Sequence, residues 1–169
     1  MWFRNDLRMD DNPALRNACL ESEEVHAIYI FSSSQNNFHN EANCKIEFLI
    51  ENLKILDQEL SKINIPLTII DSTGFKDNKD IILNLIKERA INKVFWNNQF
   101  GNDEQNRDGQ VIRSFKKNNI EFSTHHEKVI FSPGSIRTAE DKPYSVFTPF
   151  KKKWIENFNL DLLDIEFNY

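Results

Sequence analysis

Charged and amide side chains gather directly after short apolar runs in this chain, at positions where strands would end. Arg4, Asp6 and Arg8 follow the first apolar run, and the polar segment 97–104 follows the run Val94-Phe95-Trp96. Such groups can form ion pairs with one another or hold a polar ligand through hydrogen bonds. The sequence contains no glycine-rich dinucleotide-binding motif and no P-loop motif, which disfavours those two classes of nucleotide-binding protein.

Histidines raise the question of a metal site. His39 lies near Cys44, and the triplet His125-His126-Glu127 closes an expected strand. Structural zinc sites need four ligands, and neither group has companions at the usual spacing. We therefore expect no metal, and we expect His125 and His126 to be ordinary surface histidines at a strand end.

Alternating β-like and helical apolar patterns must position these side chains. Short runs predict strands near residues 1–3, 25–31, 65–70, 94–96 and 120–124, and apolar spacings of three and four predict helices between them. Asn12 followed by Pro13 predicts the start of the first helix. This alternation predicts an α/β fold: a doubly wound, Rossmann-like, three-layer domain with a five-stranded parallel sheet in the order 3-2-1-4-5. Ligands of such sheets bind outside the carboxyl ends of the strands.

The composition limits the partners and the location. The 169 residues suffice for one domain with a real core, to which 14 phenylalanines contribute, and the formal net charge is -5. A nucleic-acid-binding domain normally has a basic surplus, so the charge argues against DNA binding by this chain alone. The two cysteines form no disulfide framework, and no signal peptide or membrane-spanning run is present. These features predict a cytoplasmic protein with no membrane partner.

Three blocks of sequence resemble the DNA photolyase/cryptochrome family, in the same order and at similar separations. They span nearly the whole chain and comprise Trp2-Phe3-Arg4-Asn5-Asp6-Leu7-Arg8 with Asp11-Asn12-Pro13-Ala14-Leu15, then Asn97-Asn98-Gln99-Phe100 with Asp103-Glu104 and Arg107-Asp108, and finally Ser132-Pro133-Gly134 with Val146-Phe147-Thr148-Pro149-Phe150-Lys151 and Trp154. The resemblance identifies the chain as the amino-terminal α/β domain of a deoxyribodipyrimidine photolyase.

The resemblance implies a light-driven enzyme of two parts. The α/β domain can hold an antenna chromophore, whereas a larger helical domain holds FAD, binds UV-damaged DNA and splits the cyclobutane pyrimidine dimer by electron transfer. We expect residues 1–158 to form the α/β domain and residues 159–169 to begin the connector to that helical domain. The chain lacks the helical domain, so the parent is expected to be a carbon–carbon lyase, and the isolated chain is expected to be inactive.

The resemblance also suggests the antenna contacts. In folate-type photolyases these include a histidine after the second strand and an Asn-Glu pair after the fourth, which fall here on His39, Asp103 and Glu104. Asp103 replaces an amide with a carboxylate, and an ionised carboxylate cannot donate a hydrogen bond. The loop that carries Arg4, Asp6 and Arg8 is expected to touch the same chromophore, and methenyltetrahydrofolate is favoured over a deazaflavin.

Other interpretations remain open from the sequence. Asp6 and Arg8 could pair across their loop and Arg4 could tie a strand end to a helix, since ion pairs are common there. Asp103 and Glu104 open a helix, where acidic side chains are favourable against the helix dipole whatever the ligand. Other functional alternatives are a cryptochrome-type photoreceptor, or a receiver-like or nucleotide-binding α/β module.

Overall fold

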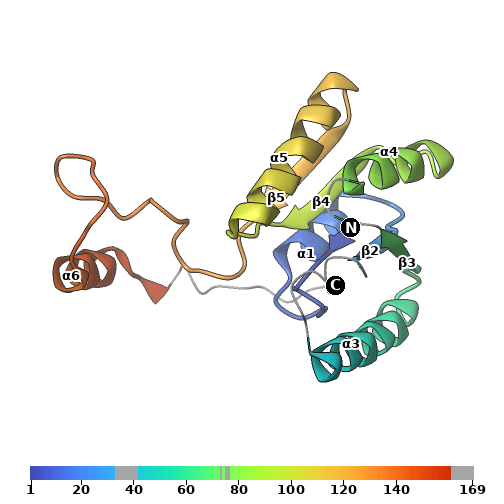
Figure 1. Cartoon of the computed structure of the whole chain (residues 1–169), viewed down its shortest axis with the longest axis horizontal. Coiled ribbons are helices and arrows are strands. Elements are labelled where there is room, and N and C mark those ends of the chain that lie inside the picture. The colour runs from blue at the N-terminus through green and yellow to red at the C-terminus, as the bar shows by residue number, and fades with distance from the viewer. Residues whose placement is uncertain (33–41, 73, 75–76, 161–169) are drawn as a thin grey trace.

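The computed structural model describes residues 1–32, 42–72, 74 and 77–160. Strands and helices alternate along the chain, as the sequence predicts (Figure 1). Their order and bounds are β1 (Trp2–Phe3), α1 (Pro13–Glu21), β2 (Ala27–Ser32), α3 (Asn43–Ser61), β3 (Leu67–Ser72), α4 (Asn78–Glu88), β4 (Lys93–Asn97), α5 (Asn102–Lys117), β5 (Glu121–His125) and α6 (Phe147–Asn157).

All strand pairs among the described residues are parallel. β2 lies between β1 and β3, and β4 pairs with β5. The parallel pairing of the second and third strands is therefore confirmed, and the partial orders 3-2-1 and 4-5 agree with the prediction. Among the described residues, however, no ladder joins β1 to β4, so the hydrogen bonds form two sheets rather than the single five-stranded sheet predicted.

Side chains connect the two sheets where the backbone ladder is missing. β1 has only two residues, and both are in register with β2. The Trp2 and Trp96 rings pack with their centroids 5.9 Å apart, and the Arg4 guanidinium donates a hydrogen bond to the Asn97 carbonyl. β1 and β4 thus lie side by side, and the strands form one continuous layer in space.

Both faces of this layer are buried, because its apolar side chains alternate in direction with the period of two that a strand requires. Phe3, Tyr29 and Phe95 pack against α1 and α3 on one face. Their chain neighbours Trp2, Ile28 and Trp96 pack against α4 and α5 on the other; of these residues, only Ile28 and Tyr29 exceed 2% exposure. This arrangement confirms the predicted three-layer α/β fold with helices on both faces.

Two further features bear on function. The predicted start of α1 is confirmed, because the Asn12 side chain accepts a hydrogen bond from the Leu15 amide at 3.1 Å and Pro13 begins the helix. In contrast, α6 has no buried residue and lies apart from the strands (Figure 1). Of the helices in the described part of the chain, none is long and apolar enough to cross a membrane.

Candidate functional site

Arg4 occupies a buried position directly after β1. Its Nη1 atom donates to both carboxylate oxygens of Asp108 in α5, at 2.7 and 2.8 Å, and its Nη2 atom donates to the Asn97 carbonyl. The guanidinium also lies over the Trp2 ring, 4.8 Å from its centroid. Arg4 therefore ties the end of a strand to a helix, which is the structural role that the sequence left open for it.

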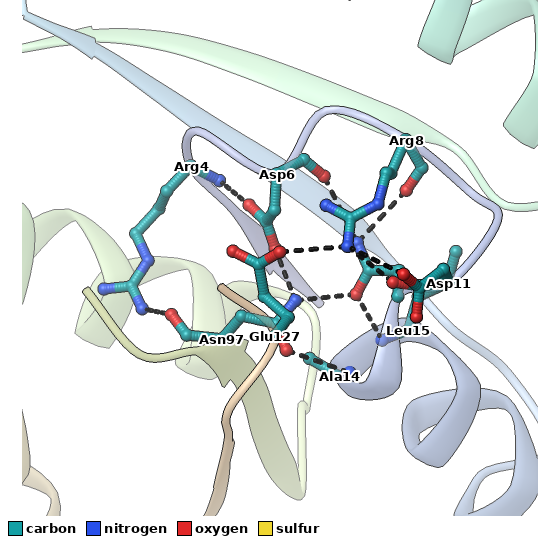
Figure 2. Close-up of polar contacts among 9 residues, drawn as sticks. Arg4, Asp6, Arg8, Asp11, Ala14, Leu15, Asn97 and Glu127 are labelled. Carbon is teal, nitrogen blue, oxygen red and sulfur yellow. Dashed lines mark hydrogen bonds and ion pairs between the residues drawn. The ribbon is translucent and has the colours of Figure 1, made fainter. Parts of the chain in front are cut away.

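Asp6 and Asn97 complete this arrangement (Figure 2). One Asp6 carboxylate oxygen accepts from the Arg4 backbone amide at 2.7 Å, and the other accepts from Asn97 Nδ2 at 2.6 Å. Asn97 Nδ2 also donates to Asn12 Oδ1 at 2.8 Å. We call Arg4, Asp6, Asn12, Asn97 and Asp108 the buried network, because each is at most 8% exposed. It fixes the loop after β1 against the carboxyl end of β4.

Burial governs the electrostatics of the buried network. The pKa of Arg4 is lowered to about 10, chiefly by loss of solvation and then by repulsion from Arg107, while Asp108 acts in the opposite direction. The guanidinium stays charged at neutral pH. Two carboxylates and two arginines, Arg4 and Arg107, thus balance one another in a region from which water is largely excluded, because Arg107 also contacts Asp108 at 2.9 Å.

Arg8 behaves differently from Arg4. Its side chain is 37% exposed and pairs with Glu127 at 2.9 Å, while its Nη2 atom also donates to the Asp11 carbonyl at 2.6 Å. The suggested pairing of Asp6 with Arg8 is seen only in the backbone, where the Arg8 amide donates to the Asp6 carbonyl at 2.7 Å. The Arg8 side chain instead links the loop to the segment after β5.

An open cleft of about 670 Å³ lies above the buried network. It opens at the carboxyl ends of the strands, where the fold rule places ligands. Polar side chains from four loops line it together with the apolar residues of β2 and α3. The lining includes Arg4, Arg8, Tyr29, Phe31, Ser32, Phe48, Leu49, Asn78, Gln99, Asp103, Glu104 and Arg107. Burial raises the pKa of Tyr29 to about 12, so this phenol remains protonated at neutral pH.

Asp103 and Glu104 stand in the first turn of α5, at the edge of the cleft. We call Arg8, Asp103 and Glu104 the rim, because all three line the cleft and are more exposed than the buried network. The Glu104 carboxylate lies back over Gly101, where a Cβ atom would collide with it. In this position it is close to the helix start, and it would have to rotate to contact a ligand deeper in the cleft.

The cleft brings together four of the six residues that the sequence indicated: Arg4, Arg8, Asp103 and Glu104. Asp6 is 4% exposed and belongs to the buried network beneath the cleft rather than to its lining. The sixth, His39, lies outside the described residues. The structure does not test whether any of these residues binds a cofactor.

Sequence reasoning assigned no role to Asn97, Asn78 or Gln99, although all three are buried. Asn97 could have been noticed, since an amide directly after the buried strand residue Trp96 must find hydrogen-bond partners. Asn78 has no such signal, because it begins a helix in an ordinary polar context. Its Oδ1 atom and the Nε atom of Arg4 are buried without a hydrogen-bond partner, and both residues line the cleft.

The histidines of the triplet after β5 stack on aromatic rings. His125 lies against Phe95 with ring centroids 6.4 Å apart, and His126 lies against Phe100 at 5.9 Å. Within the described ranges no group of three or more potential metal ligands is found. The pKa of His125 is lowered from its usual value, mainly because burial removes solvent from the ring.

Comparisons with known proteins agree with the geometry. The fold and cleft define an α/β ligand-binding domain of the doubly wound class, and a family profile described as DNA photolyase matches residues 1–166. The chain therefore belongs to the DNA photolyase family. It is 34% identical over 161 residues to a deoxyribodipyrimidine photo-lyase of Buchnera aphidicola (94% of this chain, 33% of the relative) and 33% identical over 157 residues to that of Escherichia coli (92% and 33%). The chain thus spans about a third of the length of these relatives.

Solved structures show the same fold. A class III photolyase from Agrobacterium tumefaciens superposes with a TM-score of 0.72 and 23% identity, covering 94% of this chain and 31% of that one. An archaeal photolyase from Sulfolobus tokodaii, described as holding two FAD molecules and implying a novel light-harvesting cofactor, gives 0.74 and 23%, covering 90% and 33%. The family assignment decides against the receiver-like and general nucleotide-binding alternatives.

Proposed function

We propose that this chain is the light-harvesting domain of a deoxyribodipyrimidine photolyase. The observation that carries the proposal is the cleft at the carboxyl ends of the strands, whose wall combines aromatic and aliphatic side chains with several polar groups. This composition suits a planar, conjugated ligand with polar edges. The bound chromophore would absorb light and pass the excitation to FAD, which would be held by a helical domain outside this chain.

Each part of the cleft has a distinct task in this proposal. Tyr29, Phe31 and Leu49 would contact the flat faces of the ring system. Glu104 would accept two N–H groups of an aminopyrimidinone edge, as a carboxylate can. The buried network would hold the loop after β1 rigid beneath the ligand. On this assignment Arg4 and Asp6 are positioning residues, and Arg8 and Asp103 would line the entrance with His39.

We favour methenyltetrahydrofolate over a deazaflavin as the chromophore, because Glu104 and His39 agree with the folate-type pattern. Asp103 departs from that pattern and removes one donor. The repair of cyclobutane pyrimidine dimers, the contact with UV-damaged DNA and the pairing with a helical FAD domain are proposed for the whole protein. We also propose a boundary near Phe158 and a cytoplasmic location, which suits the two free thiols, Cys19 and Cys44.

The test is a titration of methenyltetrahydrofolate into full-length protein, followed by near-ultraviolet absorbance. Glu104→Ala should weaken binding by ~1.5–3 kcal/mol, the usual size of a hydrogen bond to a charged group. Asp80→Ala is the matched control, because Asp80 is also an acid in the first turn of a helix but does not line the cleft. Equal affinity of wild type and Glu104→Ala would show that Glu104 is only a helix-start acid. No binding to either would point to another antenna.

The isolated 169-residue chain should neither repair a thymine-dimer oligonucleotide in light nor bind DNA tightly. Its net charge of -5 opposes phosphate binding, and it spans only about a third of its relatives. Light-dependent repair by the purified chain would contradict this. A cryptochrome-type photoreceptor would use the same cleft, and a full-length protein that binds the chromophore but does not repair the oligonucleotide would favour that alternative.

A further inference from the structure

The inner wall of the cleft contains a hydrogen-bond acceptor that the folded chain does not use. Asn78 is the first residue of α4 and is only 2% exposed, yet its Oδ1 atom has no hydrogen-bond partner. A buried polar atom of this kind is uncommon, because leaving it unpaired costs as much as its lost hydration. Asn78 also lines the cleft, so a ligand there could supply the missing donor.

The surroundings of Asn78 restrict what that donor can be. The cleft wall is apolar along β2, where Tyr29, Ile30 and Phe31 line it. A flexible ammonium group would lose its hydration in such a place, and Asn78 is neutral, so it offers no compensating charge. A planar heterocycle can stack on these side chains and present an uncharged ring N–H at its edge.

We propose that Asn78 recognises the polar edge of the chromophore, and that this edge carries a ring N–H beside a carbonyl. A carboxamide holds an acceptor and a donor in one plane, which matches a lactam or imide edge group for group. Pterin and isoalloxazine rings both have such an edge, so this chemistry is common to folate and flavin ligands. The inference rests on the proposed antenna function and adds the residue that sets the orientation of the ring.

The arrangement separates the two ends of the cleft. Glu104 stands at the start of α5 and Asn78 at the start of α4, so a ring held at both would be contacted from two helices. Asn78 differs from Glu104 in one respect that experiments can use. Its unpaired acceptor destabilises the empty protein, whereas Glu104 lies at a helix start where an acid is favourable. Replacing Asn78 with a branched apolar residue should therefore stabilise the empty chain and weaken the complex.

The test compares two probes, riboflavin and N3-methylriboflavin, which differ only in the ring N–H. Wild-type protein should bind riboflavin roughly five- to tenfold more tightly than the methylated probe, the scale of one neutral hydrogen bond. Asn78→Leu should abolish this preference, whereas Asn78→Asp, which retains an acceptor oxygen, should preserve its direction. Methenyltetrahydrofolate serves as a third probe, whose affinity should fall in Asn78→Leu by a similar factor.

A melting experiment without ligand gives the second readout. Asn78→Leu should raise the Tm by roughly 2–4 °C, because the unpaired acceptor is gone. Asn17→Leu is the matched control, since Asn17 lies outside the cleft and its Nδ2 atom donates to the Pro13 carbonyl at 2.7 Å. That variant should lower the Tm and leave the probe preference unchanged.

The outcomes separate this inference from the proposed function. If wild type binds the probes but does not distinguish them, or if Asn78→Leu weakens both equally, the role of Asn78 is wrong and the antenna site stands. A lower Tm in Asn78→Leu would show that Asn78 supports the fold and would overturn the inference. If wild type binds no probe at all, the antenna function and the inference that rests on it both fail.

Discussion

The buried network and the rim line the same cleft, or lie directly beneath it, but they hold their side chains in opposite ways. Arg4 and Asp6 in the buried network have partners in β4, α5 and their own loop. Asp103 and Glu104 on the rim stand near solvent at a helix start. The difference teaches that the most recognisable residues of this sequence shape the site, while contacts to a ligand must come from less conspicuous side chains around it.

Removing Arg4 should have the largest effect and would test the buried network directly. Arg4→Ala leaves Asp108 and the Asn97 carbonyl without their partner in a region with little water, so we expect a loss of ~3–5 kcal/mol in the free energy of unfolding. Urea denaturation measures it. Arg8→Ala is the comparison on the rim: its guanidinium is 37% exposed, so the loss should not exceed about 1 kcal/mol. Similar losses in the two variants would remove the distinction between buried network and rim.

Acid should weaken the edge of the molecule at His125 before it affects the buried network. The pKa of His125 is lowered in the folded chain, so below its usual value of 6.5 the unfolded chain binds more protons than the folded one. Stability should therefore fall as the pH decreases through this range. His125→Phe keeps a ring against Phe95 and should reduce this acid-side loss in denaturation curves measured from pH 7 to 5. His126→Phe is the matched variant and should retain the loss, and an identical response of both variants would contradict the assignment.

Gly101→Ala should have the smallest effect and would sharpen the description of the rim. Gly101 has φ -67° and ψ 151°, a conformation open to alanine, but the new Cβ would meet the Glu104 carboxylate. Because this side chain is flexible, we expect a stability change within about 0.5 kcal/mol. The carboxylate should move away from the helix start, so folate affinity of the full-length protein should be retained or slightly raised. A loss as large as that of Glu104→Ala would show that Gly101 itself shapes the binding site.

The fold could be predicted from the sequence because its signals are local. Trp2 and Phe3 differ by one position and point to opposite faces, as do Phe95 and Trp96, so buried strands are evident from short apolar runs. The Asn12-Pro13 pair likewise marked the start of α1. The separation into two hydrogen-bonded sheets was missed, because it depends on the length of the β1 ladder rather than on any pattern in the residues.

The site was less predictable, because its partners are distant in sequence. The position of the cleft followed from the strand ends, and four of the six indicated residues line it. The pairing of Arg4 with Asp108 and of Arg8 with Glu127 joins loops to elements far along the chain, and no periodicity encodes such pairs. Asn78 was missed for a similar reason, since only the packing around it shows that its acceptor is buried and unpaired.

The Arg4–Asp108 contact also has a consequence for folding kinetics. Its two residues are 104 positions apart, so the contact closes most of the described chain into one loop. The entropy lost in closing so long a loop must be offset by many shorter contacts that form first, and contacts of this kind are therefore made late. An interaction absent from the transition state changes the unfolding rate much more than the folding rate. The charge pair beneath the cleft should accordingly lengthen the lifetime of the native state while leaving the speed of its formation nearly unchanged.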